Sequence, residues 1–137
     1  MNLPIHHIGY LTKNLQKSID SFRNLGYQTE GGITHDQLRK IDICFLRKDG
    51  YRIELVSPYA EDSVVSGLMK THKNMPYHIA YCSENLEGDM AQLRELGFLP
   101  MEEPMAAPAF GMEKVVFLFS NRSGMIELVP PEKEEVL

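Results

Sequence analysis

The chain has 137 residues, a formal net charge of −5 at pH 7 and 43% hydrophobic residues. This length suffices for one compact domain or for two half-sized modules that share a core. The acidic balance argues against nucleic acid as a partner, because phosphate binding needs a basic face. The sequence shows no signal peptide, no membrane-spanning apolar run and only two cysteines, so we expect a cytoplasmic protein without a disulfide framework.

The first predicted elements are a strand over residues 5–11 and a helix that follows it. Thr12 is the expected N-cap of this helix. Gly26 is expected to end it, where a left-handed residue costs least. Between these two positions, apolar residues recur on one helical face: Leu15, Ile19 and Phe22.

Two strands are expected after this helix, over residues 40–46 and 51–56. The segment Lys48-Asp49-Gly50 joins them as a hairpin, because Asp-Gly supplies the positive φ angles that a tight turn needs. A short helix with one apolar side is expected over residues 62–73. These elements complete the first half of the chain.

The second half repeats this order, with strands expected over residues 77–82, 114–119 and 125–129. Its helix is expected from residues that match those of the first helix: Ser83 as the N-cap, Leu86, Met90 and Leu93 as the apolar face, and Gly97 at the end. Residues 101–112 are expected to be an apolar loop interrupted by prolines. This loop either packs on the rim of the sheet or covers a site as a lid.

Two short motifs indicate that the chain is a tandem duplication. His7-Ile8-Gly9-Tyr10 recurs as His78-Ile79-Ala80-Tyr81, and Ile53-Glu54-Leu55-Val56 recurs as Ile126-Glu127-Leu128-Val129. A repeat on this scale dictates the architecture. The sequence therefore predicts an α+β fold built from two tandem βαβββ modules.

We expect a single domain over residues 1–137. Within it the first module covers about residues 1–58, a linker helix about 59–75, the second module about 76–131, and an acidic, solvated tail 132–137.

The repeat also selects four polar residues that are expected to share one face. Alternate residues of a strand point to opposite sides of a sheet, so Ile8 and Tyr10 facing the helix leave His7 on the other side. The same argument places Glu54, His78 and Glu127 opposite the helices. A buried carboxylate must be paired, neutralised or bound to metal. Two imidazoles and two carboxylates are typical ligands of a divalent metal ion such as Ni, Co, Zn or Mn.

These motifs resemble the vicinal oxygen chelate superfamily, in which paired βαβββ modules form a curved mixed sheet around a metal. The similarity is greatest to small bacterial glyoxalase I enzymes and to methylmalonyl-CoA epimerases, and it extends from His7 to Val129. The resemblance implies that His7, Glu54, His78 and Glu127 are the metal ligands. It also implies a homodimer.

The leading interpretation is a glyoxalase I-type lyase. Such an enzyme converts a 2-oxoaldehyde–thiol hemithioacetal to a 2-hydroxyacyl thioester by proton transfer through an enediolate. A metal ion stabilises the negative charge that develops on the carbonyl oxygen, and a carboxylate serves as base. The resemblance implies Glu127 as this base, with Glu54 returning the proton to the adjacent carbon.

The alternative is an epimerase of methylmalonyl-CoA or a related acyl-CoA. Within Ile41-Asp42-Ile43-Cys44-Phe45 the apolar residues are expected to share the helix-facing side, so Asp42 would point into the cavity with Cys44 and act as a second base. Asp42 in a salt bridge near Arg39 and Lys40 is the competing interpretation. Epimerases often have glutamine where this chain has Glu54, which favours glyoxalase. A ring-cleaving dioxygenase and a non-catalytic binding protein are less favoured, because the chain keeps all four ligands.

The expected substrate is therefore a small thiol adduct or an acyl-CoA thioester. Either would carry an anionic tail, for which six cationic residues are candidates: Arg39, Lys40, Arg47, Arg52, Lys114 and Arg122.

Overall fold

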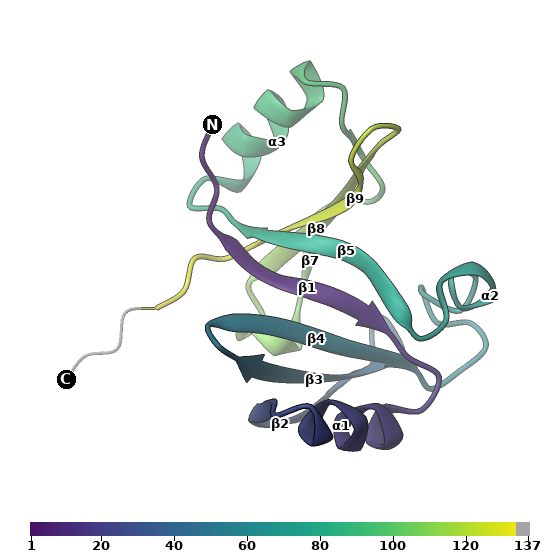
Figure 1. Ribbon diagram of the computed structural model, residues 1–137. Coiled ribbons are helices and arrows are strands. Elements are labelled where there is room, and N and C mark those ends of the chain that lie inside the picture. Colours follow the sequence, from purple (N-terminus) through teal and green to yellow (C-terminus); the bar gives the residue numbers. More distant parts are fainter. Residues whose placement is uncertain (134–137) are drawn as a thin grey trace. The chain divides into compact units, whose positions relative to one another are not determined.

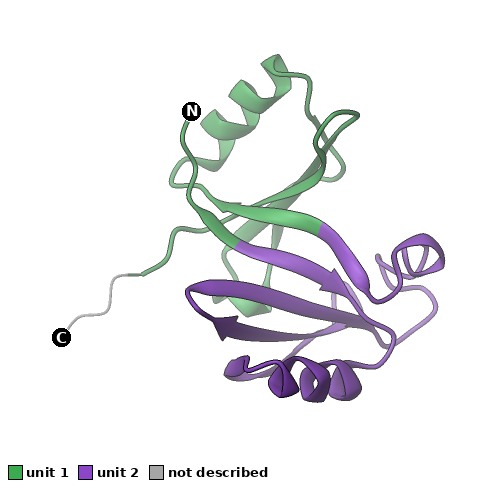
Figure 2. Ribbon diagram, in the orientation of Figure 1, with its two compact units in different colours: residues 1–6, 78–137 green, residues 7–77 purple. Residues whose placement is uncertain are grey.

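The computed structural model describes residues 1–133, which form nine strands, three α-helices and one 3₁₀ helix (Figure 1). The chain divides into two compact units (Figure 2). Unit 2 covers residues 7–77, and unit 1 combines residues 1–6 with the chain from residue 78 onward. Most of the predicted acidic tail, residues 134–137, lies outside the described residues.

Unit 2 follows the order of the first predicted module. Its elements are β1 (Ile5–Leu11, from His7 onward), α1 (Leu15–Asn24), β2 (Gln28–Asp36), β3 (Ile41–Lys48), β4 (Tyr51–Pro58), α2 (Met69–His72) and the start of β5 (Met75–Cys82). The strand order is β2-β3-β4-β1. The pairs β2–β3 and β3–β4 are antiparallel, whereas β1 lies parallel to β4. A mixed sheet of this kind places the first strand beside the last strand of the module.

Unit 1 repeats this arrangement. Its elements are the rest of β5, α3 (Leu86–Glu95), β6 (Leu99–Pro100), β7 (Met105–Ala106), the 3₁₀ helix η1 (Pro108–Phe110), β8 (Lys114–Ser120) and β9 (Gly124–Val129). The strand order is β5-β9-β8-β6, and β7 pairs with β8. Here β5 lies parallel to β9, as β1 lies parallel to β4 in unit 2. The two units confirm the predicted α+β fold of repeated modules.

Each helix covers the apolar side of its own sheet. In unit 2, Ile19 of α1 packs with four buried residues of the sheet, Cys44, Leu46, Ile53 and Leu55. In unit 1, Leu93 of α3 packs with Val116, Leu118, Ile126 and Leu128. Fully burying one such aliphatic side chain contributes about 1.5–3 kcal/mol, so these two clusters determine which side of each strand faces its helix.

The N-caps of α1 and α3 lie two residues later in the sequence than predicted. Asn14 accepts a hydrogen bond from the backbone N–H of Lys17 at 3.0 Å, and Asn85 accepts one from that of Gly88 at 3.1 Å. The prediction that Thr12 and Ser83 are the N-caps is therefore wrong. An asparagine side chain satisfies a free N–H of the first turn as well as a hydroxyl does.

Two further predictions needed correction. Of the helix expected over residues 62–73, only Met69–His72 is helical. The loop expected over residues 101–112 contains the short strand β7 and the helix η1, which Pro108 begins.

The hairpin turn between β3 and β4 is confirmed, because Asp49 and Gly50 have φ angles of 52° and 82°. Among the described residues, no helix has the length and hydropathy needed to cross a membrane.

The glycine that ends α3 provides a test of this fold. Gly97 has φ of +97°, and a Cβ added there would meet no atom within 4 Å. We expect Gly97→Ala to lower the free energy of unfolding by about 1–2 kcal/mol through backbone strain alone. Urea denaturation measures this loss. Gly67→Ala is the matched control, because Gly67 has equal space and no left-handed φ angle; equal losses in both variants would contradict the strain argument.

Candidate metal centre

Unit 2 holds a buried pair formed by a histidine and a glutamate. His7 lies on β1 and Glu54 lies on the adjacent parallel strand β4, where Glu54 is in register with Gly9. Their atoms Nε2 and Oε1 are 3.4 Å apart, and the side chains are 0% and 5% exposed. The neighbours Ile53 and Leu55 pack against α1, which directs Glu54 to the opposite face of the sheet.

Unit 1 holds the equivalent pair. His78 lies on β5 and Glu127 lies on the parallel strand β9, in register with Ala80. Nε2 of His78 and Oε1 of Glu127 are 3.2 Å apart, and the side chains are 0% and 6% exposed. Ile126 and Leu128 pack against α3, so the alternation along the strand again directs the glutamate away from the helix. The predicted directions of both glutamates are confirmed.

Each pair has an aromatic neighbour that sequence reasoning missed. The ring centroids of Phe45 and His7 are 5.4 Å apart with an interplanar angle of 71°, and those of Phe117 and His78 are 5.0 Å apart at 89°. Phe45 is the direct cross-strand partner of Glu54, and Phe117 is that of Glu127. The repeat could have identified them, because Phe45-Leu46 recurs as Phe117-Leu118.

The donor set fits a divalent metal ion. Each pair offers one imidazole nitrogen and one carboxylate oxygen, and all four residues, His7, Glu54, His78 and Glu127, are buried. Imidazole nitrogen and carboxylate oxygen are ligands that Zn, Ni, Co, Mn and Fe(II) share. Two carboxylates also balance the double charge of the ion, which removes the penalty of burying them ionised.

The orientation predicted for Asp42 is wrong. Phe45 pairs with Glu54 across β3 and β4, so Ile41, Ile43 and Phe45 lie on the side of the His7–Glu54 pair, and Asp42 with Cys44 lies on the other. Cys44 accordingly packs under α1, where burial raises the pKa of its thiol. Sequence reasoning failed here because both sides of β3 carry apolar residues.

Asp42 instead interacts with β2. Its Oδ1 lies 2.7 Å from Nδ1 of His35, and the histidine ring stacks on Tyr59 with centroids 4.4 Å apart. This contact is near the surface, since the two ion-pairing side chains are 52% and 31% exposed. Asp42 thus interacts with His35 on the face of the sheet away from the His7–Glu54 pair.

Four of the six cations expected to anchor an anionic tail form ion pairs within unit 2. Arg39 is buried and pairs with Asp36 at 3.0 Å, and Lys40 pairs with Asp62. Arg47 and Arg52 both pair with Glu30, at 3.0 and 3.1 Å. These pairs connect β2 and the following loops to the sheet. Lys114 and Arg122 are exposed in unit 1.

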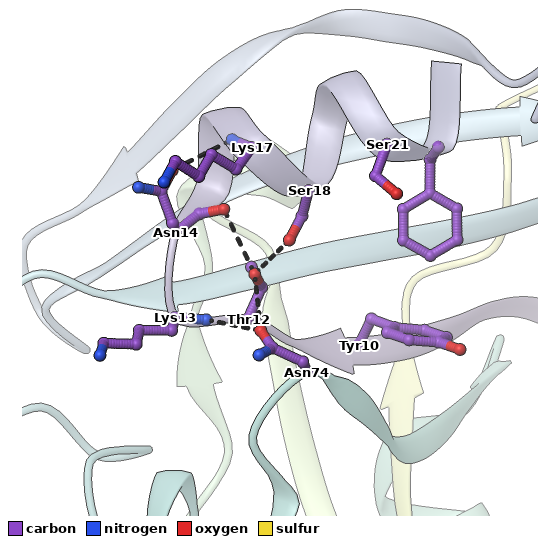
Figure 3. A pocket seen from close by; sticks show the side chains of 9 residues that line it. Tyr10, Thr12, Lys13, Asn14, Lys17, Ser18, Ser21 and Asn74 are labelled. Atoms are coloured by element: carbon purple, nitrogen blue, oxygen red, sulfur yellow. Dashed lines mark hydrogen bonds between the residues drawn. The ribbon is translucent and has the colours of Figure 1, made fainter. Parts of the chain in front are cut away.

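A cavity of about 630 Å³ lies on the α1 side of unit 2, and two other lysines, Lys13 and Lys17, line it (Figure 3). Figure 3 shows the Thr12 hydroxyl at its centre, hydrogen-bonded to Ser18 and Asn74. The other lining residues are Tyr10, Asn14, Ser21 and Phe22. Because Tyr10 and Phe22 belong to the helix-side core, this cavity and the His7–Glu54 pair lie on opposite faces of the sheet.

His6, which the repeat excludes as a ligand, contacts other residues of unit 1. Its ring lies edge-on to Phe110 with centroids 5.2 Å apart, and its Nε2 is 3.8 Å from Oε1 of Glu132. These contacts agree with the choice of His7 over His6 as the equivalent of His78.

The fold matches solved structures of low sequence identity. A hypothetical protein from Bacillus halodurans C-125 is 21% identical, with a TM-score of 0.84 over 99% of this chain and 98% of its own. A methylmalonyl-CoA epimerase from Mycobacterium tuberculosis is 20% identical, with a TM-score of 0.80 over 95% and 89%. A variant Streptomyces coelicolor methylmalonyl-CoA epimerase in complex with 2-nitronate-propionyl-CoA is 21% identical, with a TM-score of 0.81 over 99% and 100%.

No curated protein sequence matches this chain. A family model does match, over residues 6–117, and this range includes both histidines and the first glutamate of the two pairs. The resemblance to the vicinal oxygen chelate superfamily is thereby confirmed. The chain belongs to the Glyoxalase/Bleomycin resistance protein/Dioxygenase superfamily.

Proposed function

We propose that His7, Glu54, His78 and Glu127 together bind one divalent metal ion, and that the protein catalyses proton transfer at a carbon next to a carbonyl group. The observation that carries this proposal is the presence of one buried His–Glu pair in each unit. If a buried His–Glu pair served only to stabilise the fold, one pair would suffice and the second unit would not need to repeat it. Two equivalent pairs, each on parallel strands and each opposite a helix, supply a complete ligand set.

The chemistry follows from the charges of these residues. A divalent ion supplies a Lewis acid that stabilises the negative charge developing on a carbonyl oxygen. A general base must lie close to the carbon that loses the proton. The carboxylates of Glu54 and Glu127 would lie beside a carbonyl group bound at this site, so one could accept the proton and the other could return it. The surroundings are apolar, since Val56, Val115 and Val129 lie on the same strand faces as the two pairs and are buried. Low polarity strengthens the interaction between a carboxylate and a positive charge.

The leading candidate reaction is epimerisation of methylmalonyl-CoA or a related acyl-CoA. Solved epimerases of this type share the fold over nearly the whole chain, although at only 20–21% identity in the two cases above. Their substrate is a thioester whose acidic carbon lies between two carbonyl groups. The proposed chemistry of the two pairs suits such a substrate.

Glyoxalase I is the second candidate, and Glu54 favours it. Unit 2 contributes with Glu54 a carboxylate that mirrors Glu127 of unit 1, and the Nε2–Oε1 distances are 3.4 Å in unit 2 and 3.2 Å in unit 1. Two carboxylates suit a reaction in which one removes a proton and the other returns it to the adjacent carbon. Asp42 lies on the other face of the sheet and contacts His35, which argues against its acting as the additional base expected of an epimerase.

Metal binding is tested by replacing one glutamate at a time. We expect Glu54→Gln and Glu127→Gln each to weaken binding of Ni, Co, Zn or Mn by more than about tenfold, since changes outside the ligand set already cost that much. Isothermal titration of the metal-free protein measures the dissociation constant. Glu95→Gln is the matched control, because Glu95 is exposed at the end of α3. Unchanged affinity in both site variants would contradict the proposed centre.

The substrate is tested with the metal-loaded protein in two assays. Epimerisation predicts exchange of the C2 proton of methylmalonyl-CoA with deuterated solvent, followed by NMR. Glyoxalase activity predicts thioester formation from methylglyoxal and glutathione, followed by absorbance. In whichever assay is positive, Glu127→Gln should lower kcat by about 10²–10⁴-fold, the usual contribution of a general base. A metal-loaded protein inactive in both assays would rule out both candidate reactions.

A further inference from the structure

We infer that Phe45 and Phe117 are positioning residues that hold the imidazoles of His7 and His78 in the orientation needed to bind a metal ion. This inference rests on the proposed function, because it assigns a role to two residues next to the proposed ligands. Neither phenylalanine carries an atom that could bind the ion. Their effect would come from the rings they contact.

The first argument is the geometry within each unit. In unit 2, the glutamate stands on β4 between the strands that carry the other two side chains, β3 with Phe45 and β1 with His7. The ring of Phe45 reaches across β4 to meet the ring of His7 at 5.4 Å and 71°. An edge-to-face contact of this kind restrains rotation of the imidazole about its bond to Cβ. That rotation decides whether Nε2 points toward Glu54.

The second argument is that unit 1 repeats all three positions. Glu127 stands on β9, between β8 with Phe117 and β5 with His78. The ring contact is again nearly perpendicular, at 5.0 Å and 89°. The position before each phenylalanine differs between the units, since Val116 packs under α3 where unit 2 has Cys44 under α1, whereas the phenylalanine is repeated.

The third argument concerns exposure. Phe45 and Phe117 are only partly buried, whereas His7 and His78 have side chains that are 0% exposed. Each phenylalanine ring therefore contacts an imidazole that is less accessible than the phenylalanine itself. Removing the ring would admit water beside the imidazole and free it to turn. Groups that orient a ligand by hydrogen bonding typically change metal affinity by about 10–100-fold when they are removed, and we expect an effect at the lower end of this range for the two rings.

The experiment compares Phe45→Leu and Phe117→Leu with two matched controls. Phe119→Leu removes an exposed ring from the same strand as Phe117. Phe22→Leu removes a ring that contacts Tyr10 and Tyr27 on the helix side of unit 2. Cobalt(II) affinity and the visible spectrum of bound cobalt(II) are measured for each variant, together with the free energy of unfolding in urea. Phe45→Tyr and Phe117→Tyr, which keep the ring, serve as conservative variants.

We expect the two site variants to bind cobalt(II) about tenfold or more weakly and to alter its spectrum, and the tyrosine variants to restore both. Phe22→Leu should lose stability without changing affinity or spectrum. In the metal-free protein, histidine ring signals in NMR should move in the two site variants, because the ring contact exists before the metal binds.

Three outcomes overturn the inference. Wild-type affinity and spectrum in Phe45→Leu and Phe117→Leu would show that the rings do not position the ligands. Affinity that falls in proportion to stability across all variants, Phe22→Leu included, would show a general packing effect. Failure of the wild-type protein to bind cobalt(II) at all would contradict the proposed function as well. This outcome differs from the other two, in which the wild type binds cobalt(II) and only the comparison with the variants contradicts the inference.

Discussion

The structure depends on one constraint, the burial of a carboxylate on the middle strand of each sheet. Glu54 stands between Ile53 and Leu55, and both of these residues are buried under α1. A slip of one residue in the register of β4 would exchange the two faces and place the carboxylate in an aliphatic core. An uncompensated charge there would cost several kcal/mol. The helix-side cluster of each unit therefore stabilises the fold and also determines the face of the sheet on which the glutamate lies.

Parallel pairing brings the members of each His–Glu pair together. The chain leaves β1, passes through α1, β2 and β3, and comes back as β4, which pairs in parallel with β1. Residues far apart in the sequence thereby become neighbours. The same crossover by way of α3 joins β5 to β9. A helix that buries one side of a sheet and a crossover that sets β4 beside β1, or β9 beside β5, are thus sufficient to bring a histidine to a glutamate. The remaining strands contribute the aromatic neighbours.

Much of this arrangement could be predicted from the repeat and from strand alternation. These two arguments place β1, β4, β5 and β9 and the direction of both glutamates, because the apolar residues on either side of each glutamate pack in the helix-side cluster. They fail for β3, where Ile43 and Cys44 are buried on opposite sides and the pattern has no polar face. The bounds of β2 could not be predicted, because its exposed, glycine-containing sequence shows no alternation of apolar and polar residues.

The cap residues illustrate a different limit. Thr12 and Asn14 are both good N-cap types, and sequence alone does not say which of them the chain geometry places at the first turn. Thr12 is instead buried, and its hydroxyl meets Ser18 and Asn74. Ser83 is likewise buried and donates to Asp89 at 2.5 Å. The repeat therefore preserves the true caps and the buried hydroxyls together, two residues apart.

The division of the chain into units has a consequence for how the protein is made. Unit 1 includes residues 1–6, and the carbonyl of Pro4 accepts a hydrogen bond from the backbone N–H of Cys82 at 2.8 Å. Residues 1–6 are therefore synthesised before unit 2, and their unit is complete only when the chain from residue 78 onward has followed. A cut between the two copies of the repeat would separate residues 1–6 from the rest of unit 1. The duplicated sequence is modular, but its halves are not independent pieces.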